Sequence, residues 1–271
     1  MVNLFGKGFV GTHYSNMYEC VINDRNDLTP KTNNILYTIS TTDNYHVRTN
    51  PYIDIDTNLT TLIRVLENCK GKDIVLNFVS SWFVYGQTDS PFTEDSYCNP
   101  KGFYSITKRT AEQLLISYCE TFNIKYRILR LANVVGPGDR GVSKKKNALT
   151  YLIREIVKNN NIDLYDDGMF YRDYIHVTDV CKAINLIMEK GDVNTIYNIG
   201  NGEAILFRDA IDYVLDKTKS TSNVNSIPQA EFHRQVQVKS MSMSNQKLKD
   251  LGYTAEYTLP KILDNLILEQ Y

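Results

Sequence analysis

The 271-residue chain lacks the features that mark several specialised classes of protein. Its five cysteines are scattered, odd in number and never arranged as Cys-x-x-Cys. This pattern predicts reduced thiols and a cytoplasmic protein rather than a disulfide-bonded secreted one. The four histidines show no ligand spacing, so the sequence predicts no metal site.

Long apolar runs and a strong net charge are also missing. No charged-then-apolar leader opens the sequence and no apolar run is long enough to cross a bilayer, so we expect no membrane partner. The formal net charge of −1 does not indicate nucleic acid as a partner. The 42% hydrophobic and 23% charged content is typical of a globular protein.

Apolar runs alternate with helical patterns along the first half of the chain. The runs at 2–5, 19–24, 34–40, 73–81 and 125–133 predict strands, and apolar residues recur at helical spacing over 58–69 and 105–122. This alternation predicts an α/β fold with a Rossmann-type, doubly wound parallel sheet. We expect residues 1–135 and about 160–200 to form a dinucleotide-binding domain, and about 136–160 and 201–271 to form a smaller C-terminal substrate lobe.

The stretch "GKGFVG", residues 6–11, follows the first predicted strand and precedes a short helix. In the dinucleotide-binding pattern G-x-G-x-x-G, Gly6 would allow a tight turn, Gly8 the approach of a pyrophosphate and Gly11 close packing. Asp24, at the end of the second strand, would bond the adenosine ribose, whereas Arg25 would meet a 2′-phosphate. A plain charged turn explains either residue equally well.

Tyr104 and Lys108 lie one helical turn apart in "GFYSITKRTAEQ". Spacing alone leaves two interpretations open, an acid/base pair or two ordinary residues of a surface helix. The same Tyr-x-x-x-Lys pattern recurs twice, but there a proline breaks the helical turn, at Tyr97/Lys101 and at Tyr257/Lys261.

Eight stretches, in order along nearly the whole chain, resemble the extended short-chain dehydrogenase/reductase family in its nucleotide-sugar epimerase/dehydratase branch. They are "GKGFVG", "NPYIDIDTNL", "SSWFVYG", "GFYSITKRTAEQ", "RILRLANVVGPGDR", "YDDGMFYRDYIHVTDV", "IYNIGNG" and "KLKDLGY". The resemblance implies NAD as cofactor, with NADP as the alternative, and a nucleotide-diphosphate sugar as substrate. It implies a cofactor site made of Gly6, Gly8, Phe9, Val10, Gly11, Asp24, Arg25, Ser40 and Lys108.

The resemblance also implies a catalytic group. Tyr104 would be the acid/base, Lys108 would support it, and Ser81 would bond the reacting sugar oxygen. A phenol with an ordinary pKa near 10 is a poor base at neutral pH, and a nearby ammonium favours the phenolate. The implied substrate site consists of Ser81, Asn133, Asn147, Leu149, Leu164, Tyr165 and Arg172. Arg172 would grip the diphosphate, and a salt bridge to Asp173 or Asp179 is the alternative.

One departure from the family pattern concerns the reaction. Trp82 and Phe83 stand where the 4,6-dehydratases have an Asp-Glu pair, and neither side chain can move a proton. The sequence therefore disfavours dehydration and favours epimerisation at sugar C4 by transient oxidation and re-reduction. The alternatives are an NAD(P)H-dependent reductase of a nucleotide-linked 4-keto-6-deoxy sugar and a non-catalytic dinucleotide sensor.

Other departures concern the binding sites. Phe5 replaces a glycine, "Ser40-Thr41-Thr42" replaces small apolar residues, and about one strand–helix unit is trimmed after Asp24. Lys239 and Ser242 match an Arg and an Asp of the family, which weakens one expected phosphate contact.

The resemblance implies a homodimer formed through the helices at 58–69 and 105–122. A candidate apolar stripe exists on both helices, and packing against the core is the alternative use of the same residues. The stripe consists of Leu59, Ile63 and Leu66, then Leu115, Ile116 and Cys119.

Overall fold

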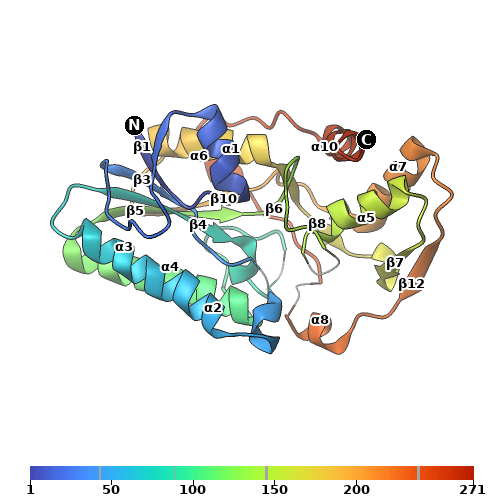
Figure 1. Ribbon diagram of the computed structural model, residues 1–271, viewed down its shortest axis with the longest axis horizontal. Helices are drawn as coiled ribbons and strands as arrows, with labels where there is room; N and C mark the ends of the chain where they lie inside the picture. The colour runs from blue at the N-terminus through green and yellow to red at the C-terminus, as the bar shows by residue number, and fades with distance from the viewer. Residues whose placement is uncertain (43, 89, 144–145, 237–238) are drawn as a thin grey trace.

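The computed structural model describes residues 1–42, 44–88, 90–143, 146–236 and 239–271. Its centre is a six-stranded sheet in the order β2-β1-β3-β4-β5-β10, with all neighbours parallel (Figure 1). The strands are β1 (Val2–Phe5), β2 (Cys20–Ile22), β3 (Asn34–Tyr37), β4 (Val75–Ser81), β5 (Lys125–Leu131) and β10 (Thr195–Ile199). The predicted α/β fold with a doubly wound parallel sheet is confirmed.

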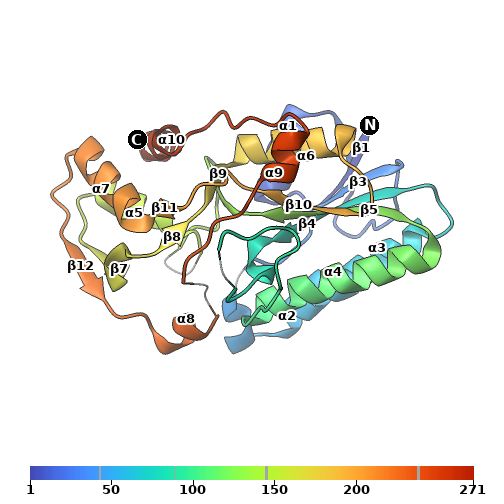
Figure 2. The ribbon, with the colours of Figure 1, turned by 180° about the vertical axis from the view of Figure 1, so that it is seen from behind.

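Helices cover both faces of this sheet (Figures 1 and 2). The helices α3 (Thr61–Cys69) and α4 (Phe103–Phe122) lie on one face, and α1 (Phe9–Met17) and α6 (Val177–Lys190) lie on the other. Short turns connect them: η1 (Asn44–Arg48), α2 (Tyr52–Ile55), η2 (Asp56–Thr60) and η3 (Trp82–Val84). Within the described ranges, no helix is both long enough and apolar enough to span a bilayer.

The helix predicted over 58–69 begins with the π-helical turn η2 rather than with a regular α-helix. This turn contains the buried Asn58, whose Nδ2 donates to Thr41 Oγ1 at 2.8 Å and to Thr107 Oγ1 at 3.0 Å. Its Oδ1 accepts from the Thr41 backbone N–H at 2.9 Å. The side chain therefore ties this turn to the segment that follows β3.

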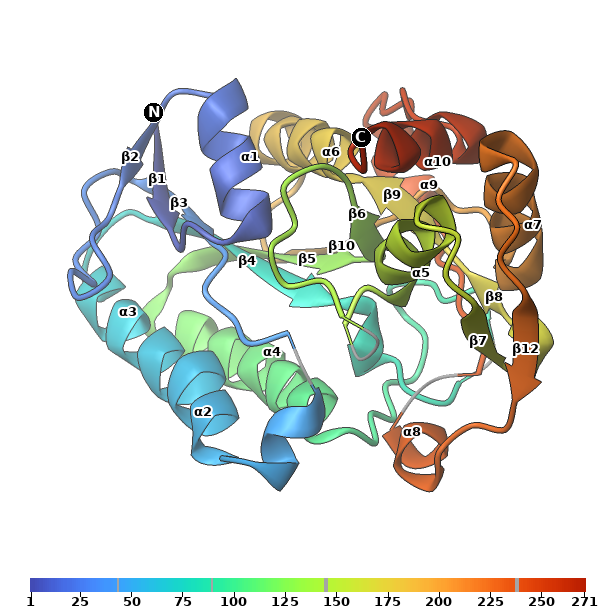
Figure 3. The same cartoon turned by 45° about the vertical axis from the view of Figure 1, so that its right-hand side comes forward.

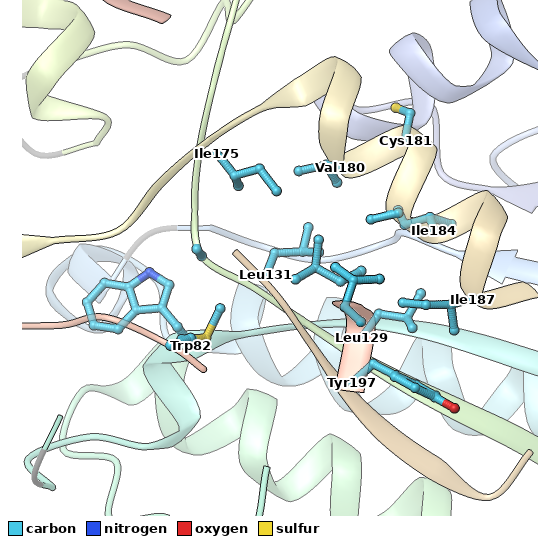
Figure 4. Packing of buried hydrophobic residues seen from close by; sticks show 14 of the residues in the cluster. Trp82, Leu129, Leu131, Ile175, Val180, Cys181, Ile184, Ile187 and Tyr197 are labelled. Atoms are coloured by element: carbon cyan, nitrogen blue, oxygen red, sulfur yellow. The ribbon is translucent and has the colours of Figure 1, made fainter. Parts of the chain in front are cut away.

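Two hydrophobic clusters sandwich the sheet. The first lies between the sheet and α6, where side chains such as Leu129, Ile184 and Ile187 interdigitate (Figure 4). The second lies between the sheet and the pair α3/α4, and it includes Phe5, stacked on Tyr37 with ring centroids 6.5 Å apart. The phenylalanine that replaces the family glycine is therefore a core residue. Each such side chain contributes about 1.5–3 kcal/mol when fully buried.

A third cluster builds the smaller lobe on the right of Figure 3. It is held by two two-stranded sheets, β7 (Ile162–Tyr165) with β12 (Val224–Ile227), and β8 (Tyr171–Arg172) with β11 (Ile205–Leu206). The helices of this lobe are α5 (Ala148–Val157), α7 (Phe207–Thr218), α8 (Glu231–Val236) and α10 (Leu259–Leu268), with the turn η4 (Asp166–Gly168). The pair β6 (Asn133–Val135) and β9 (Tyr174–His176) joins the two parts, and α9 (Gln246–Asp250) packs beside β10.

Packing in these clusters guides the division into domains. Ile162 and Leu164 pack in the third cluster, although we expected residues 160–172 to belong with the sheet. Met241, Met243 and Leu248 pack in the first cluster, although we expected 201–271 to belong to the lobe. We propose that 162–172 belong to the substrate lobe and 241–253 to the dinucleotide-binding domain.

In the part of the chain that the structure describes, the sheet ends at β2, without a further strand beyond it. Residues 23–33 form neither helix nor strand, whereas the common doubly wound order has a further strand beyond the second one. The buried Asn23 closes the connection by donating from Nδ2 to the carbonyls of Asp27 (2.8 Å) and Thr29 (2.9 Å). The expected loss of a strand–helix unit is confirmed.

Candidate functional site

The glycine loop between β1 and α1 has the geometry that its pattern predicts. Gly6 has φ of +102°, a conformation that side chains disfavour. A Cβ on Gly11 would come within 2.1 Å of the Gly6 carbonyl oxygen, so close packing requires glycine there. A Cβ on Gly8 would meet nothing within 4 Å, which leaves that side of the loop open.

The start of α1 suits an anion. Gly8 occupies the N-cap and supplies no side-chain cap, so the first N–H groups of the helix are available to a ligand. Phe9 and Val10 form the first turn, and Val10 packs against the first cluster. The loop and helix end therefore fit a dinucleotide pyrophosphate.

Replacing Gly11 and Gly8 by alanine should separate these two roles. Gly11→Ala forces a Cβ against backbone and should destabilise the fold by about 1–3 kcal/mol, with a weaker affinity for NADH. Gly8→Ala points into open space and should weaken NADH binding while leaving the melting temperature unchanged. Thermal unfolding and NADH fluorescence titration measure the two effects. Equal melting temperatures for Gly11→Ala and the wild type would contradict the packing argument.

The remaining predicted cofactor residues lie along the same edge of the sheet. Asp24 and Arg25 are exposed on a turn beyond β2, in which the Asp27 N–H donates to the Asp24 carbonyl at 3.0 Å. Ser40 follows β3, and its hydroxyl donates to the Thr41 carbonyl at 2.6 Å. The structure brings Ser40 toward the predicted catalytic residues, and it leaves Asp24 and Arg25 at the outer edge.

Tyr104 and Lys108 face inward from the first turns of α4, at the carboxyl end of β4. Tyr104 is 6% exposed and Lys108 is 1% exposed, so neither is an ordinary residue of a surface helix. Burial raises the pKa of Tyr104 to about 12, although hydrogen bonding with Ser81 and Ser40 acts to lower it. Ser81 ends β4, so the strand end and the helix start bring the three predicted catalytic residues together.

Lys108 lies one helical turn beyond Tyr104 on α4, in apolar surroundings. Its Nζ donates to the Val79 carbonyl at 2.8 Å and lies 4.2 Å from the centre of the Phe78 ring. Burial lowers the pKa of Lys108 to about 7, and the Glu112 carboxylate acts to raise it. The charge of this lysine at neutral pH therefore depends on its neighbours.

A cavity of about 370 Å³ opens between the two lobes beside Trp82 and Phe83. Six of the seven predicted substrate residues line it, namely Asn133, Asn147, Leu149, Leu164, Tyr165 and Arg172. The seventh, Ser81, directly precedes Trp82 in the chain. The Phe83 ring lies edge-on to the Tyr104 ring, with centroids 6.0 Å apart, and therefore connects the cavity wall to Tyr104.

Arg172 is half-buried in this cavity. Its Nη1 donates to the carbonyls of Tyr171 (2.7 Å) and Lys239 (2.8 Å), and its guanidinium lies 4.5 Å from the centre of the Phe170 ring. Burial lowers its pKa to about 10, which leaves it charged at neutral pH.

The carboxylates considered as alternative partners of Arg172 accept hydrogen bonds from backbone amides. Asp173 accepts from the N–H groups of Asn201 and Gly202, and Asp179 accepts from those of Glu256 and Tyr257. The two acids therefore join segments of the fold.

Sequence patterns missed part of the cavity wall. Thr42, Asn44, Tyr45 and His233 also line it, from irregular or short segments without periodicity. The His233 ring lies against Tyr165, with centroids 4.8 Å apart, and Phe232 lies against Tyr45 at 5.0 Å. Through these contacts α8 links the lobe to the segment after β3, and the two lie side by side in Figures 1 and 2.

Ser242, which stands where the family pattern has an acid, is held within the fold. Ser242 is buried, and its backbone N–H donates to Ser90 Oγ at 2.9 Å. Its carbonyl accepts from the Phe92 N–H at 2.9 Å, so it joins two segments that are far apart in the sequence. That match to the family pattern therefore marks a structural residue.

Comparison with known proteins identifies the family of the chain. Residues 6–200 match the model of the NAD dependent epimerase/dehydratase family. The chain belongs to this family. Among the described residues, no group of three or more histidine, cysteine or acidic side chains is placed to hold a metal ion.

Individual relatives are more distant. The chain is 28% identical over 182 residues to the low-salt glycan biosynthesis protein Agl12 of Haloferax volcanii, covering 66% of this chain and 56% of that protein. It is 32% identical over 173 residues to a putative UDP-glucose 4-epimerase of Methanocaldococcus jannaschii, covering 61% and 54%. The UDP-glucose 4-epimerase structure of Thermotoga maritima with UDP-glucose superposes with a TM-score of 0.85 at 21% identity, covering 99% and 97%. This chain thus spans a little over half the length of the two curated relatives.

Proposed function

We propose that the chain is an NAD-dependent nucleotide-sugar epimerase that acts at C4 of the sugar, with NADP as the alternative cofactor. The observation that carries the proposal is that one cavity, lined by the predicted substrate residues, leads along Phe83 to the buried Tyr104. A sugar whose diphosphate meets Arg172 can extend along this wall and present C4 to Tyr104.

The roles of the residues follow from their positions. Bound NAD supplies the hydride acceptor and donor at C4. Tyr104, as phenolate, takes the proton of the C4 hydroxyl, and it returns that proton when the opposite face of C4 receives the hydride. Lys108, as ammonium, favours the phenolate, and Ser81 holds the C4 oxygen by a hydrogen bond.

The cavity wall argues against dehydration. Trp82 and Phe83 stack on each other with ring centroids 4.0 Å apart and line the cavity. Loss of water from a sugar needs one group that removes a proton from carbon and another that protonates the departing hydroxyl. Neither ring can do this. Chemistry that needs only Tyr104, Lys108, Ser81 and a nicotinamide remains.

A second candidate is the NAD(P)H-dependent reduction of a nucleotide-linked 4-keto-6-deoxy sugar. The observation that favours it is the short sheet edge at residues 23–33, which offers less surface for the adenosine half of the cofactor. A weakly held adenosine suits a cofactor that leaves after each turnover, as a reductase requires.

One experiment tests the proposal against this alternative. The purified protein is incubated with UDP-, dTDP-, GDP- and CDP-sugars, with and without added NADH or NADPH, and the products are separated by chromatography. An epimerase converts a sugar into its C4 epimer without added reductant and retains oxidised cofactor through purification. Turnover only with stoichiometric consumption of reduced cofactor would favour the reductase, and no turnover with any sugar would contradict both.

The five cysteines are free thiols, which supports the proposal that the enzyme works in the reducing cytoplasm. The proposed catalytic residues likewise include no cysteine.

We further propose a homodimer formed through the outer faces of α3 and α4. Leu66, Leu115 and Cys119 are buried in the second cluster and serve the core. Ile106 and Leu114, at 46% and 39% exposure, remain on the outer face of α4 and are candidates for the seam. Ile116 is partly buried against the core, so a charge there would also disturb folding.

Leu114→Glu should therefore convert a dimer into a monomer, because it would leave a charge unpaired in a buried seam. The control is Leu268→Glu, at an exposed position on α10 (71% exposure) far from these helices in Figure 1. Size-exclusion chromatography with light scattering measures the mass. A wild-type monomer at micromolar concentration would contradict the proposal.

A further inference from the structure

We propose that Glu112 is a positioning residue that favours the ammonium form of Lys108. The residue is not among those that line the cavity, so we infer that it acts on the reaction through Lys108. The kinetic part of this inference rests on the function proposed above.

The geometry starts from helical spacing. Tyr104, Lys108 and Glu112 are four residues apart on α4, so the three side chains lie along one face of the helix. Glu112 is fully buried. Its Oε1 accepts from Ser80 Oγ at 2.6 Å, and Ser80 directly precedes the proposed catalytic Ser81 on β4.

Two arginines hold the same carboxylate. Arg130 of β5 donates from Nε to Oε1 at 3.0 Å and from Nη2 to Oε2 at 2.8 Å. Arg109 of α4 donates from Nη1 to Oε2 at 2.8 Å. Although burial raises the pKa of Glu112, the hydrogen bonds and charge of Arg130 hold it below its ordinary value, so Glu112 is an anion at neutral pH.

The charge balance around Lys108 depends on this anion. β4 offers Lys108 the Phe78 ring and the Val79 carbonyl, α4 adds Tyr104, Arg109 and Glu112, and β5 adds Arg130 beyond Glu112. Glu112 is the carboxylate of this group that acts on Lys108, whereas the buried Asp54 acts on Tyr104. Without it, burial and the two guanidinium groups would all favour the neutral amine of Lys108. A neutral amine does not stabilise a phenolate, so Tyr104 would lose its support.

A purely structural role is the competing explanation, because Glu112 also ties α4 to β4 and β5. The two explanations differ in how activity depends on pH. Glu112→Gln keeps the shape and a hydrogen-bonding oxygen but removes the charge. We expect the limb of the kcat/KM profile that is set by the pKa of Lys108 to move to lower pH by about one unit.

Two further variants are compared with Glu112→Gln. Ser80→Ala removes one hydrogen bond to Glu112 without changing charge, and it should leave the limb in place. Arg109→Gln removes a half-exposed cation and should move the limb upward by a few tenths of a unit. Arg109→Gln also serves if Glu112→Gln does not fold. An unmoved limb in both Glu112→Gln and Arg109→Gln overturns the proposal in favour of the structural role.

A measurement of stability gives a readout without substrate. The unfolded lysine has a pKa of 10.5 and the folded one about 7, so the unfolding free energy falls as pH falls through this window and levels near pH 7. In Glu112→Gln the levelling should occur below pH 7, so the stability difference from the wild type should grow between about pH 8 and 6. A difference that stays constant over this range overturns the inference. If no nucleotide sugar turns over, the proposed function fails, while this measurement still decides the role of Glu112.

Discussion

Replacing Tyr104 by phenylalanine should lower kcat by several orders of magnitude and leave the fold intact. Only the hydroxyl is lost, and Phe83 and the rest of the pocket wall keep their contacts with the ring. Loss of an essential acid/base typically costs about 10²–10⁴-fold, and more when the residue also binds the reacting oxygen.

The chain provides a matched control in Tyr97. It begins another Tyr-x-x-x-Lys pattern, but it is 75% exposed and a proline interrupts the turn. Tyr97→Phe should therefore have wild-type activity. Steady-state kinetics on the sugar identified in the panel measures both variants, and Tyr104→Phe within a few-fold of the wild type would remove Tyr104 from the mechanism.

Arg172→Ala should raise KM for the nucleotide sugar about 10- to 150-fold with little change in NADH affinity. A hydrogen bond to a charged group contributes about 1.5–3 kcal/mol, and the flat guanidinium suits phosphate oxygens. Arg172→Lys keeps the charge but loses the fork, so an intermediate KM is expected.

The control for Arg172 is Arg208→Ala in the same lobe. Arg208 donates to Asp212 and Asp167 at the surface, and its loss should leave KM unchanged. Isothermal titration with UDP or dTDP measures substrate-side affinity directly. Unchanged affinity in Arg172→Ala would show that the residue serves the fold through its bonds to the Tyr171 and Lys239 carbonyls.

Short-range patterns predicted much of the fold and the grouping of the candidate site. The close approach of Gly11 to the Gly6 carbonyl is a contact within six residues, so "GKGFVG" indicated that part of the loop well. Tyr104 and Lys108 share a helix face because four residues complete about one turn. Ser40 and Ser81 meet them because parallel strands end at one edge of the sheet.

Such patterns could not predict contacts between irregular segments that are distant in the sequence. Tyr45 and His233 line the cavity from a short turn and a short helix, and nothing periodic in the sequence connects them. The stripe on α4 was also ambiguous, because an apolar residue covers the sheet or a partner with the same spacing. Leu115 and Cys119 proved to face the core, where α4 packs over the sheet.

The most direct test of the proposed chemistry follows a label at C4. A nucleotide sugar that carries deuterium at C4 is incubated with the wild-type protein in ordinary water, and the epimer is analysed by NMR spectroscopy and mass spectrometry. Transient oxidation and re-reduction at C4 predicts that the product keeps its deuterium at C4, because the hydride leaves to the bound nicotinamide and returns to the other face. Replacement of that deuterium by solvent hydrogen would contradict hydride transfer at C4, and with it the account of the site.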